Sequence, residues 1–271
     1  MRKFGMVGAG FVALAYLAAL ILVPGSVAIA QQAPAKAAVS AVDPARRAEI
    51  ETVVRDYLIA HPEVIREALD ALDKRQKEAD AKTVANLVGD KSGPLYSSKF
   101  QAVAGNPKGD VELVEFFDYN CPYCKASLPD LTRLLAKNPR VKLILKDLPI
   151  LGPGSVETAR VASATREQLD GPKFWAFQSK LLAIRDPQGL GASQALAVAA
   201  AAGVDVAKAK ADMTSPAIDA GLKETLGMAN TLGVTGTPTF VIGGDTVVGA
   251  VGFEALQGKI DAVEKCGKGT C

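Results

Sequence analysis

The feature that most constrains the fold is a short apolar run that leads, after a three-residue loop, into a Cys-x-x-Cys motif. The run is residues 111–117, Val-Glu-Leu-Val-Glu-Phe-Phe, which contains no turn residue and is typical of a buried central strand. After the loop, the sequence predicts a helix that begins at Cys121 and runs to about Lys137. A buried strand that feeds directly into a helix indicates an α/β domain.

The rest of the pattern fits one α/β core with a helical insertion. A second strand is predicted at residues 141–146, and strand signals return late in the chain on both sides of a Gly-Gly-Asp turn. A last helix is predicted at about residues 253–264. We therefore expect a domain over residues 105–265, interrupted by helices at about 155–230.

The first thirty residues have the pattern of a secretory signal peptide. Two cations precede an apolar run over residues 4–23, and small residues lead up to Ala30. We expect residues 1–30 to be cleaved after Ala30, because a Pro-Gly pair interrupts the run just before that site. The protein would then be periplasmic. The alternative is an outward-facing membrane-anchored protein, since the run approaches the ~20 residues of a spanning helix.

Composition excludes several classes of function. Cleavage would remove two cations and no acid, so the formal net charge of +2 would become zero, and no nucleic-acid partner is predicted. The chain has one histidine, His61, which excludes most histidine-based triads and histidine-rich metal sites.

A helical arm is predicted between the signal peptide and the domain. Residues 31–44 are rich in Ala, Gln and Pro and are expected to form a flexible linker. In residues 45–90, apolar side chains recur at intervals of three and four, with a second helix starting near Pro62. Such narrow stripes need a packing partner. It is either the domain of the same chain or, as we favour, residues 45–88 of another copy in a homo-oligomer.

The Cys-x-x-Cys motif places Cys121 and Cys124 one helical turn apart, within disulfide distance. The spacing alone permits half of a zinc site, a structural bridge or a redox pair. The preceding strand favours the redox pair, because free backbone N–H groups and the helix dipole would stabilise a thiolate at the start of a helix. We expect Cys121 to have a lowered pKa and to be the exposed sulfur, with Cys124 shielded.

Three segments resemble the DsbA family of thioredoxin-like thiol–disulfide oxidoreductases. Residues 115–124, Glu-Phe-Phe-Asp-Tyr-Asn-Cys-Pro-Tyr-Cys, resemble its active-site segment, and residues 148–155 are similar to its turn after the second core strand. Residues 233–240, Gly-Val-Thr-Gly-Thr-Pro-Thr-Phe, resemble the thioredoxin cis-proline loop. The likeness covers about residues 111–264. It implies a thioredoxin fold, catalysis by Cys121 and Cys124, and no cofactor.

The resemblance also implies roles for residues around the cysteines. Pro238 would follow a cis peptide bond and face the two cysteines. The backbone of Thr237 would pair with an extended substrate segment. Pro122 and Tyr123, between the two cysteines, would contact the substrate.

Glu115 is a carboxylate inside an apolar strand, where an unpaired charge is unfavourable. It shares a face of the strand with Leu113 and Phe117. The resemblance places an acid here beneath the buried cysteine, with Lys146 on the neighbouring strand as its partner. We interpret Glu115 as a proton acceptor for Cys124; the alternative is a solvated charge at a sheet edge.

The sequence leaves the direction of disulfide exchange with substrates open. An oxidised site would form disulfides in substrates, whereas a reduced site would isomerise wrong ones. Thr237 before Pro238 and the Pro-Tyr pair of the motif resemble exported isomerase-type members. The arm also favours isomerisation, because an oligomer can present several sites around one misfolded client. The expected partners are unfolded or misfolded exported proteins with cysteines, and a membrane redox partner.

The second cysteine pair, Cys266 and Cys271, is expected to form a small structural disulfide. It could instead be an accessory redox pair. A function of another class would be a zinc or copper site that uses all four cysteines. Pro238 argues against that site, because it would crowd the metal, and no metal is predicted. A non-catalytic adaptor on the same scaffold would leave both motif cysteines dispensable.

Overall fold

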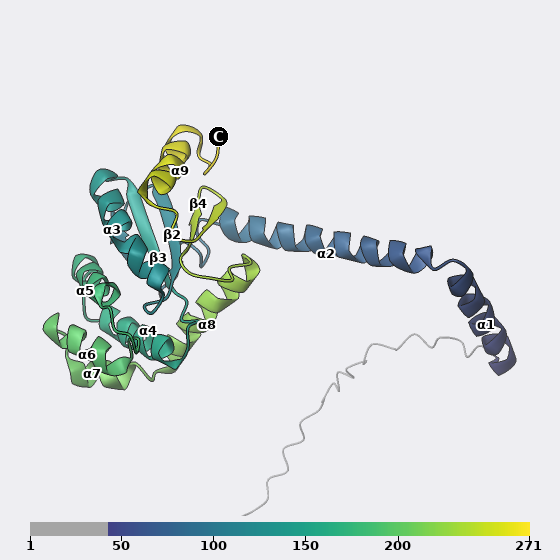
Figure 1. The fold of residues 1–271 in the computed structure, drawn as a ribbon, viewed down its shortest axis with the longest axis horizontal. Helices are drawn as coiled ribbons and strands as arrows, with labels where there is room; N and C mark the ends of the chain where they lie inside the picture. The colour runs from purple at the N-terminus through teal and green to yellow at the C-terminus, as the bar shows by residue number, and fades with distance from the viewer. Residues whose placement is uncertain (1–42) are drawn as a thin grey trace, which may run out of the picture. The chain divides into compact units, whose positions relative to one another are not determined.

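The structure is a computed structural model of the chain, and it describes residues 43–271 (Figure 1). The expected signal peptide, residues 1–30, and all but the end of the expected linker, residues 31–44, lie outside the described residues. Among the described residues, none of the helices combines the length and the apolar character needed to cross a bilayer.

The observed elements follow the predicted order of strand, helix, strand, helical block, hairpin and helix. In chain order they are α1 Pro44–Ala60, α2 Glu63–Gly89, β1 Ala102–Gly105, β2 Val111–Phe117, α3 Pro122–Lys137, β3 Val141–Asp147, α4 Pro153–Arg166, α5 Gly171–Ala183, α6 Ala192–Ala201, α7 Val206–Asp212, α8 Pro216–Thr231, β4 Thr239–Ile242, β5 Asp245–Val248 and α9 Phe253–Cys266. Sequence reasoning missed β1, whose four residues are too few to show a period.

The five strands form one sheet in the order β1-β3-β2-β4-β5. β2 and β3 are parallel, and the other neighbours are antiparallel. Because alternate residues of a strand point to opposite faces, the sheet has two cores. One contains Leu113 and Phe117 with side chains of α3, α5 and α9, and the other contains Val114 and Phe116 with Met228 of α8.

The segment 90–101, between α2 and β1, covers part of the second face of the sheet. Its Leu95 and Tyr96 are fully buried against Val114 and Ile144. Leu87 and Val88, at the end of α2, pack against the same core. The end of α2 is therefore fixed to the domain by apolar contacts.

The two predicted N-terminal helices are present as α1 and α2. The chain divides into two units, residues 1–65 and 66–271. Neither helix has a buried side chain, and both expose large apolar residues. These are Ile50, Val53, Val54, Tyr57, Ile59, Ile65, Leu69 and Leu72. The polar stretch after Leu72 does not interrupt α2, and Gln76 donates to Asp80 within it at 2.8 Å.

Candidate active site

Cys121 is the N-terminal capping residue of α3. Pro122 follows in the first turn, where the missing N–H of proline leaves no helical bond unmade. The Cys121 N–H donates to Asp118 O at 3.1 Å, and the Lys125 N–H donates to Cys121 O at 3.0 Å. The sulfur of Cys121 therefore lies at the positive end of the helix, as expected from the sequence.

The loop before Cys121 is held by two side chains that sequence reasoning did not single out. The Asp118 carboxylate accepts from the backbone N–H groups of Ile150 and Leu151, at 2.9 and 3.0 Å. The amide of Asn120 donates to Leu190 O at 2.9 Å and accepts from Leu190 N at 2.6 Å. Their position just before the motif was the available signal. Together they tie the cysteine loop to the turn after β3 and to the helical insertion.

The Thr237–Pro238 peptide bond is cis, as expected. The Cys121 sulfur lies 3.0 Å from Thr237 O. Antiparallel pairing of β4 with β2, in which Thr239 lies opposite Phe116, brings this loop beside the cysteines. The carbonyl of Thr237 thus faces the sulfur for which the sequence predicts a lowered pKa.

The expectation that Cys121 is exposed was wrong. Its residue is only 4% exposed, because the Thr237–Pro238 loop packs over it, and Cys124 is 1% exposed. Tyr123, between them, is 66% exposed. The motif therefore exposes Tyr123 and covers both cysteines.

The two thiols have pKa values displaced in opposite directions. A hydrogen bond from the Cys124 thiol, helped by the Thr237 side chain and by the backbone N–H groups of Tyr123 and Cys124, lowers the pKa of Cys121 to about 5. The same hydrogen bond, burial and the charge of Glu115 raise the pKa of Cys124 far above its ordinary value. At neutral pH the pair therefore holds a thiolate at Cys121 and a thiol at Cys124.

Glu115 is 1% exposed and belongs to a strand with neighbours on both sides. The alternative of a solvated charge at a sheet edge is therefore wrong. It shares its face with Leu113 and Phe117, as expected, and its Oε2 has no hydrogen-bond partner. Burial, followed by the nearby Cys121 thiolate, raises the pKa of Glu115 to about 8.

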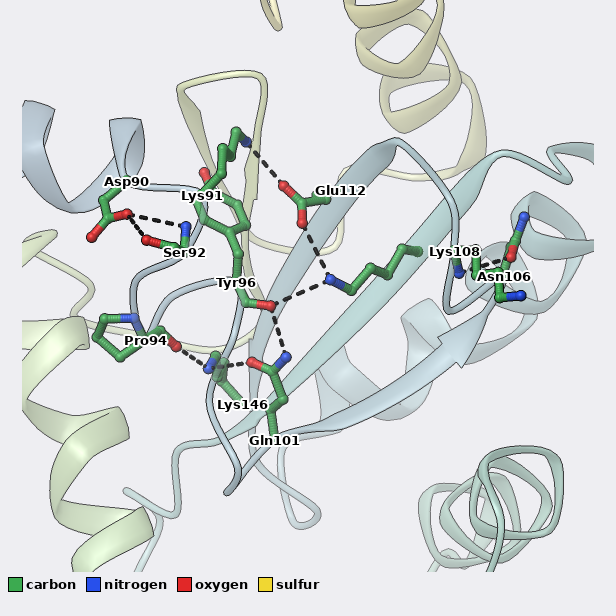
Figure 2. Close-up of polar contacts among 11 residues, drawn as sticks. Asp90, Lys91, Ser92, Pro94, Tyr96, Gln101, Asn106, Lys108, Glu112 and Lys146 are labelled. Carbon is green, nitrogen blue, oxygen red and sulfur yellow. Dashed lines mark hydrogen bonds and ion pairs between the residues drawn. The ribbon is translucent and has the colours of Figure 1, made fainter.

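The predicted pair of Glu115 with Lys146 is not formed. The parallel register sets Lys146 beside Phe116, so its side chain leaves the opposite face of the sheet. There Lys146 Nζ donates to Pro94 O at 2.6 Å and to Gln101 Oε1 at 2.8 Å (Figure 2). Burial lowers the pKa of Lys146 to about 8. Lys146 therefore holds the 90–101 segment and does not neutralise Glu115.

Cys266 and Cys271 form a disulfide, as expected for the structural interpretation. The loop that they close lies against the turn after β4, where the Gly269 N–H donates to Gly243 O at 2.9 Å. Pro238 and the motif cysteines lie at the other end of β4. The four cysteines therefore do not form one site. Direct exchange between the two pairs of one chain is excluded as well.

Residues 112–261 match the family model described as the DSBA-like thioredoxin domain. The chain belongs to the DSBA-like thioredoxin domain family. Residues 47–79, in α1 and α2, match a second model, described as the copper resistance protein ScsC N-terminal domain. The fold of this DsbA-like chain is thus a thioredoxin fold with a helical insertion, preceded by N-terminal helices.

Solved structures share the fold of this DsbA-like chain. A thioredoxin-like oxidoreductase from Silicibacter pomeroyi DSS-3 has 35% identity and a TM-score of 0.59, over 67% of this chain and 98% of that one. ScsC from Proteus mirabilis, in a transitional conformation, has 27% identity and a TM-score of 0.57, over 80% of this chain and 94% of that one. The second match includes more of the chain.

The thiol:disulfide interchange protein DsbA of Bordetella pertussis is 28% identical over 141 residues, which are 50% of this chain and 65% of that protein. A matching Na(+)/H(+) antiporter NhaA 3 from Salinispora tropica is 28% identical over 160 residues, 58% of this chain and 24% of its own length. The DsbA-like chain thus spans less than two thirds of these curated relatives.

Proposed function

We propose that the protein is an exported thiol–disulfide oxidoreductase that exchanges disulfides with protein substrates through Cys121 and Cys124. The observation that carries the proposal is the placement of Cys121. Its sulfur lies at the start of α3, beside the carbonyl of Thr237 that precedes the cis-proline, and its pKa is lowered to about 5. A thiolate of this kind is both an available nucleophile and a good leaving group.

The exchange needs only the two motif cysteines. In the reducing direction, the Cys121 thiolate attacks one sulfur of a substrate disulfide and releases one substrate thiolate. The Cys124 sulfur then attacks the mixed disulfide, passes its proton to a base and releases the second substrate thiolate, leaving the Cys121–Cys124 disulfide. We propose Glu115 as that base, because it is buried and acts electrostatically on Cys124, and because the mixed disulfide removes the Cys121 charge that helps to raise its pKa.

The substrate would lie along the cis-proline loop. We propose that an extended client segment pairs with the backbone at Thr237, which leaves Pro122 and Tyr123 to contact its flanking residues. Ile150 and Leu151, which Asp118 holds beside the motif loop, are exposed apolar side chains. Such a surface favours unfolded or misfolded proteins over folded ones.

The direction that we favour is isomerisation of wrong disulfides. The arm supports it, because α1 and α2 expose a series of apolar side chains that a second copy could cover, giving several sites around one client. Residues 47–79 also match the ScsC N-terminal domain. We propose a homo-oligomer through residues 45–88.

An oxidase is the second candidate, and the lowered pKa of Cys121 favours it. A stabilised thiolate makes the Cys121–Cys124 disulfide easy to surrender to a substrate. This function requires reoxidation by a membrane partner. For either function we propose a periplasmic location, which agrees with the description of one similar structure as a periplasmic thioredoxin-like protein from Salmonella enterica serovar Typhimurium.

The deciding experiment compares recovery of activity from scrambled ribonuclease and from fully reduced ribonuclease, with the protein and its Cys121→Ser variant. We expect efficient rescue of the scrambled form. Rescue of the reduced form alone would instead mean an oxidase. Activity that survives Cys121→Ser would overturn the assignment of the site and would favour the adaptor or another thiol.

A further inference from the structure

A cavity of about 740 Å³ lies away from the cysteine motif. It is bounded by β1, the end of α3 and the start of α5. Cys121 precedes the first turn of α3, whereas Leu135, which lines the cavity, is near the last residue of that helix. The rise of the helix between these two residues is about 21 Å. The cavity is therefore separate from the proposed site of thiol exchange.

Apolar side chains form most of the wall of this cavity. Leu135, Leu169 and Trp175 pack against the core that α3, α5 and α9 share, but they remain only partly buried. Close-packed interiors leave few voids larger than a water molecule, and this cavity has a volume typical of small-molecule sites, which are roughly 300 to 1,000 Å³. The wall therefore fits the apolar body of a ligand.

Arg166 of α4 is the only charged residue in the wall. Its side chain is 14% exposed, and its guanidinium donates to Phe100 O. Among the described residues its one ion pair is with the exposed Glu167, at 3.7 Å. Asp147 lines a neighbouring small cavity with Arg166 but forms no ion pair with it. Because a guanidinium has five N–H donors, Arg166 keeps donors for one further anion.

The wall offers little to a peptide. Its only side-chain amide, that of Gln101, donates to Tyr96 O and accepts from Lys146, both at 2.8 Å (Figure 2). The outer edge of β1 is covered by the start of α5, since a Cβ on Gly171 would lie 3.6 Å from Val103 O. The backbone amides of a peptide would therefore lack partners here, which is unfavourable. An aliphatic chain with one anionic end avoids that loss.

We propose that this cavity binds an apolar monocarboxylate of the fatty-acid class, with its carboxylate on Arg166 and its chain between β1 and α5. Guanidinium groups hold carboxylates through two parallel N–H···O bonds. A single cation favours a monoanion over a phosphate dianion, because the second charge would stay unpaired against an apolar wall. This binding is an additional property of the protein and does not depend on the proposed exchange of thiols.

The test follows the fluorescence of Trp175, which is the only tryptophan of the chain and lines the cavity. The protein is titrated with decanoate, with decyl phosphate, and with decyltrimethylammonium, which has the same chain and a cationic head. The variants are Arg166→Gln and Arg166→Lys. The matched control is Arg160→Gln, because Arg160 is also a partly buried arginine of α4 but pairs with Asp219 outside this cavity.

We expect decanoate to change the emission of Trp175 saturably and to bind at least about tenfold more tightly than decyltrimethylammonium. Arg166→Gln should abolish this preference, Arg166→Lys should keep part of it, and Arg160→Gln should leave it intact. Equal binding of the two ligands, or a preference that survives in Arg166→Gln, would overturn the site. Tighter binding of decyl phosphate than of decanoate would overturn the assignment to a monocarboxylate.

A second measurement needs no substitution, so it does not depend on whether the variants of Arg166 fold. In proton–nitrogen correlation spectra of the unmodified protein, decanoate should shift the resonances of the Trp175 indole and of the Val103 amide. The amides of Tyr123 and Cys124, at the other end of α3, should not move. Shifts confined to residues outside the cavity would contradict the proposal.

Discussion

At the scale of single residues, the chemistry of the site depends on the hydrogen bond that the Cys124 thiol donates to the Cys121 sulfur. The largest contribution to the lowered pKa of Cys121 is the hydrogen bond from the Cys124 thiol, ahead of Thr237 and the backbone N–H groups. The helix start therefore supplies only part of the stabilisation. The partner cysteine has a second role, as a donor, before it becomes the resolving nucleophile.

This role predicts a difference between two substitutions of Cys124. Cys124→Ala removes the donor, so the pKa of Cys121 should rise from about 5 toward the ordinary cysteine value of about 8.5. Cys124→Ser keeps a hydroxyl donor and should give a smaller rise. Alkylation of Cys121 by iodoacetamide as a function of pH measures the midpoint, because only the thiolate reacts. Equal midpoints in the two variants would contradict this account.

At the scale of elements, the C-terminal tail of the DsbA-like domain is attached to the end of the sheet that is remote from the cysteine motif. Asp245, at the start of β5, accepts from Lys259 of α9 at 2.6 Å and is also contacted by the Thr270 hydroxyl. Gly269 lies so close to β4 that a Cβ there would be 2.5 Å from Ile242 O. The Cys266–Cys271 disulfide closes this tail.

The position of the disulfide predicts a change in stability without a change in exchange. Replacement of both Cys266 and Cys271 by serine should lower the free energy of unfolding by about 2 kcal/mol, the loop-entropy value for so short a loop. Urea denaturation measures this change. The rate at which Cys121 releases aryl thiolate from a chromogenic aryl disulfide should stay the same, because the tail and the motif lie at opposite ends of β4. A large loss of exchange would show instead that the tail supports the site.

At the scale of the whole molecule, α1 and α2 present apolar side chains that neither helix buries. The end of α2 packs through Leu87 and Val88 on the core under the 90–101 segment. A deletion that tests the arm must therefore keep these two residues.

Deletion of residues 44–82 is predicted to convert the proposed oligomer into a monomer, measured by light scattering in solution. The monomer should still react with a chromogenic aryl disulfide, since the site lies wholly within residues 112–261. It should rescue scrambled ribonuclease less well than the full chain, because each client would meet one site at a time. An unchanged mass per particle, corrected for the deletion, would refute the oligomer.

The sequence alone predicted the features that depend on neighbouring residues. The strand before the motif and the helix that starts at Cys121 each follow from a short run of residues, because secondary structure is specified locally. The cis-proline loop before β4 was predicted from its resemblance to the loop of thioredoxin-like proteins. Cys266 and Cys271 could be paired for the same reason, since five positions separate them.

Only the tertiary structure decided which distant side chains meet. The register of β2 with β3 sent Lys146 to the 90–101 segment and placed Asp147 beside Glu115, and neither outcome is visible in either strand by itself. The cover over Cys121 comes from Thr237, more than a hundred positions away. A one-residue change of register reverses the face of every side chain, so these contacts depend on how whole elements pair and not on any local pattern.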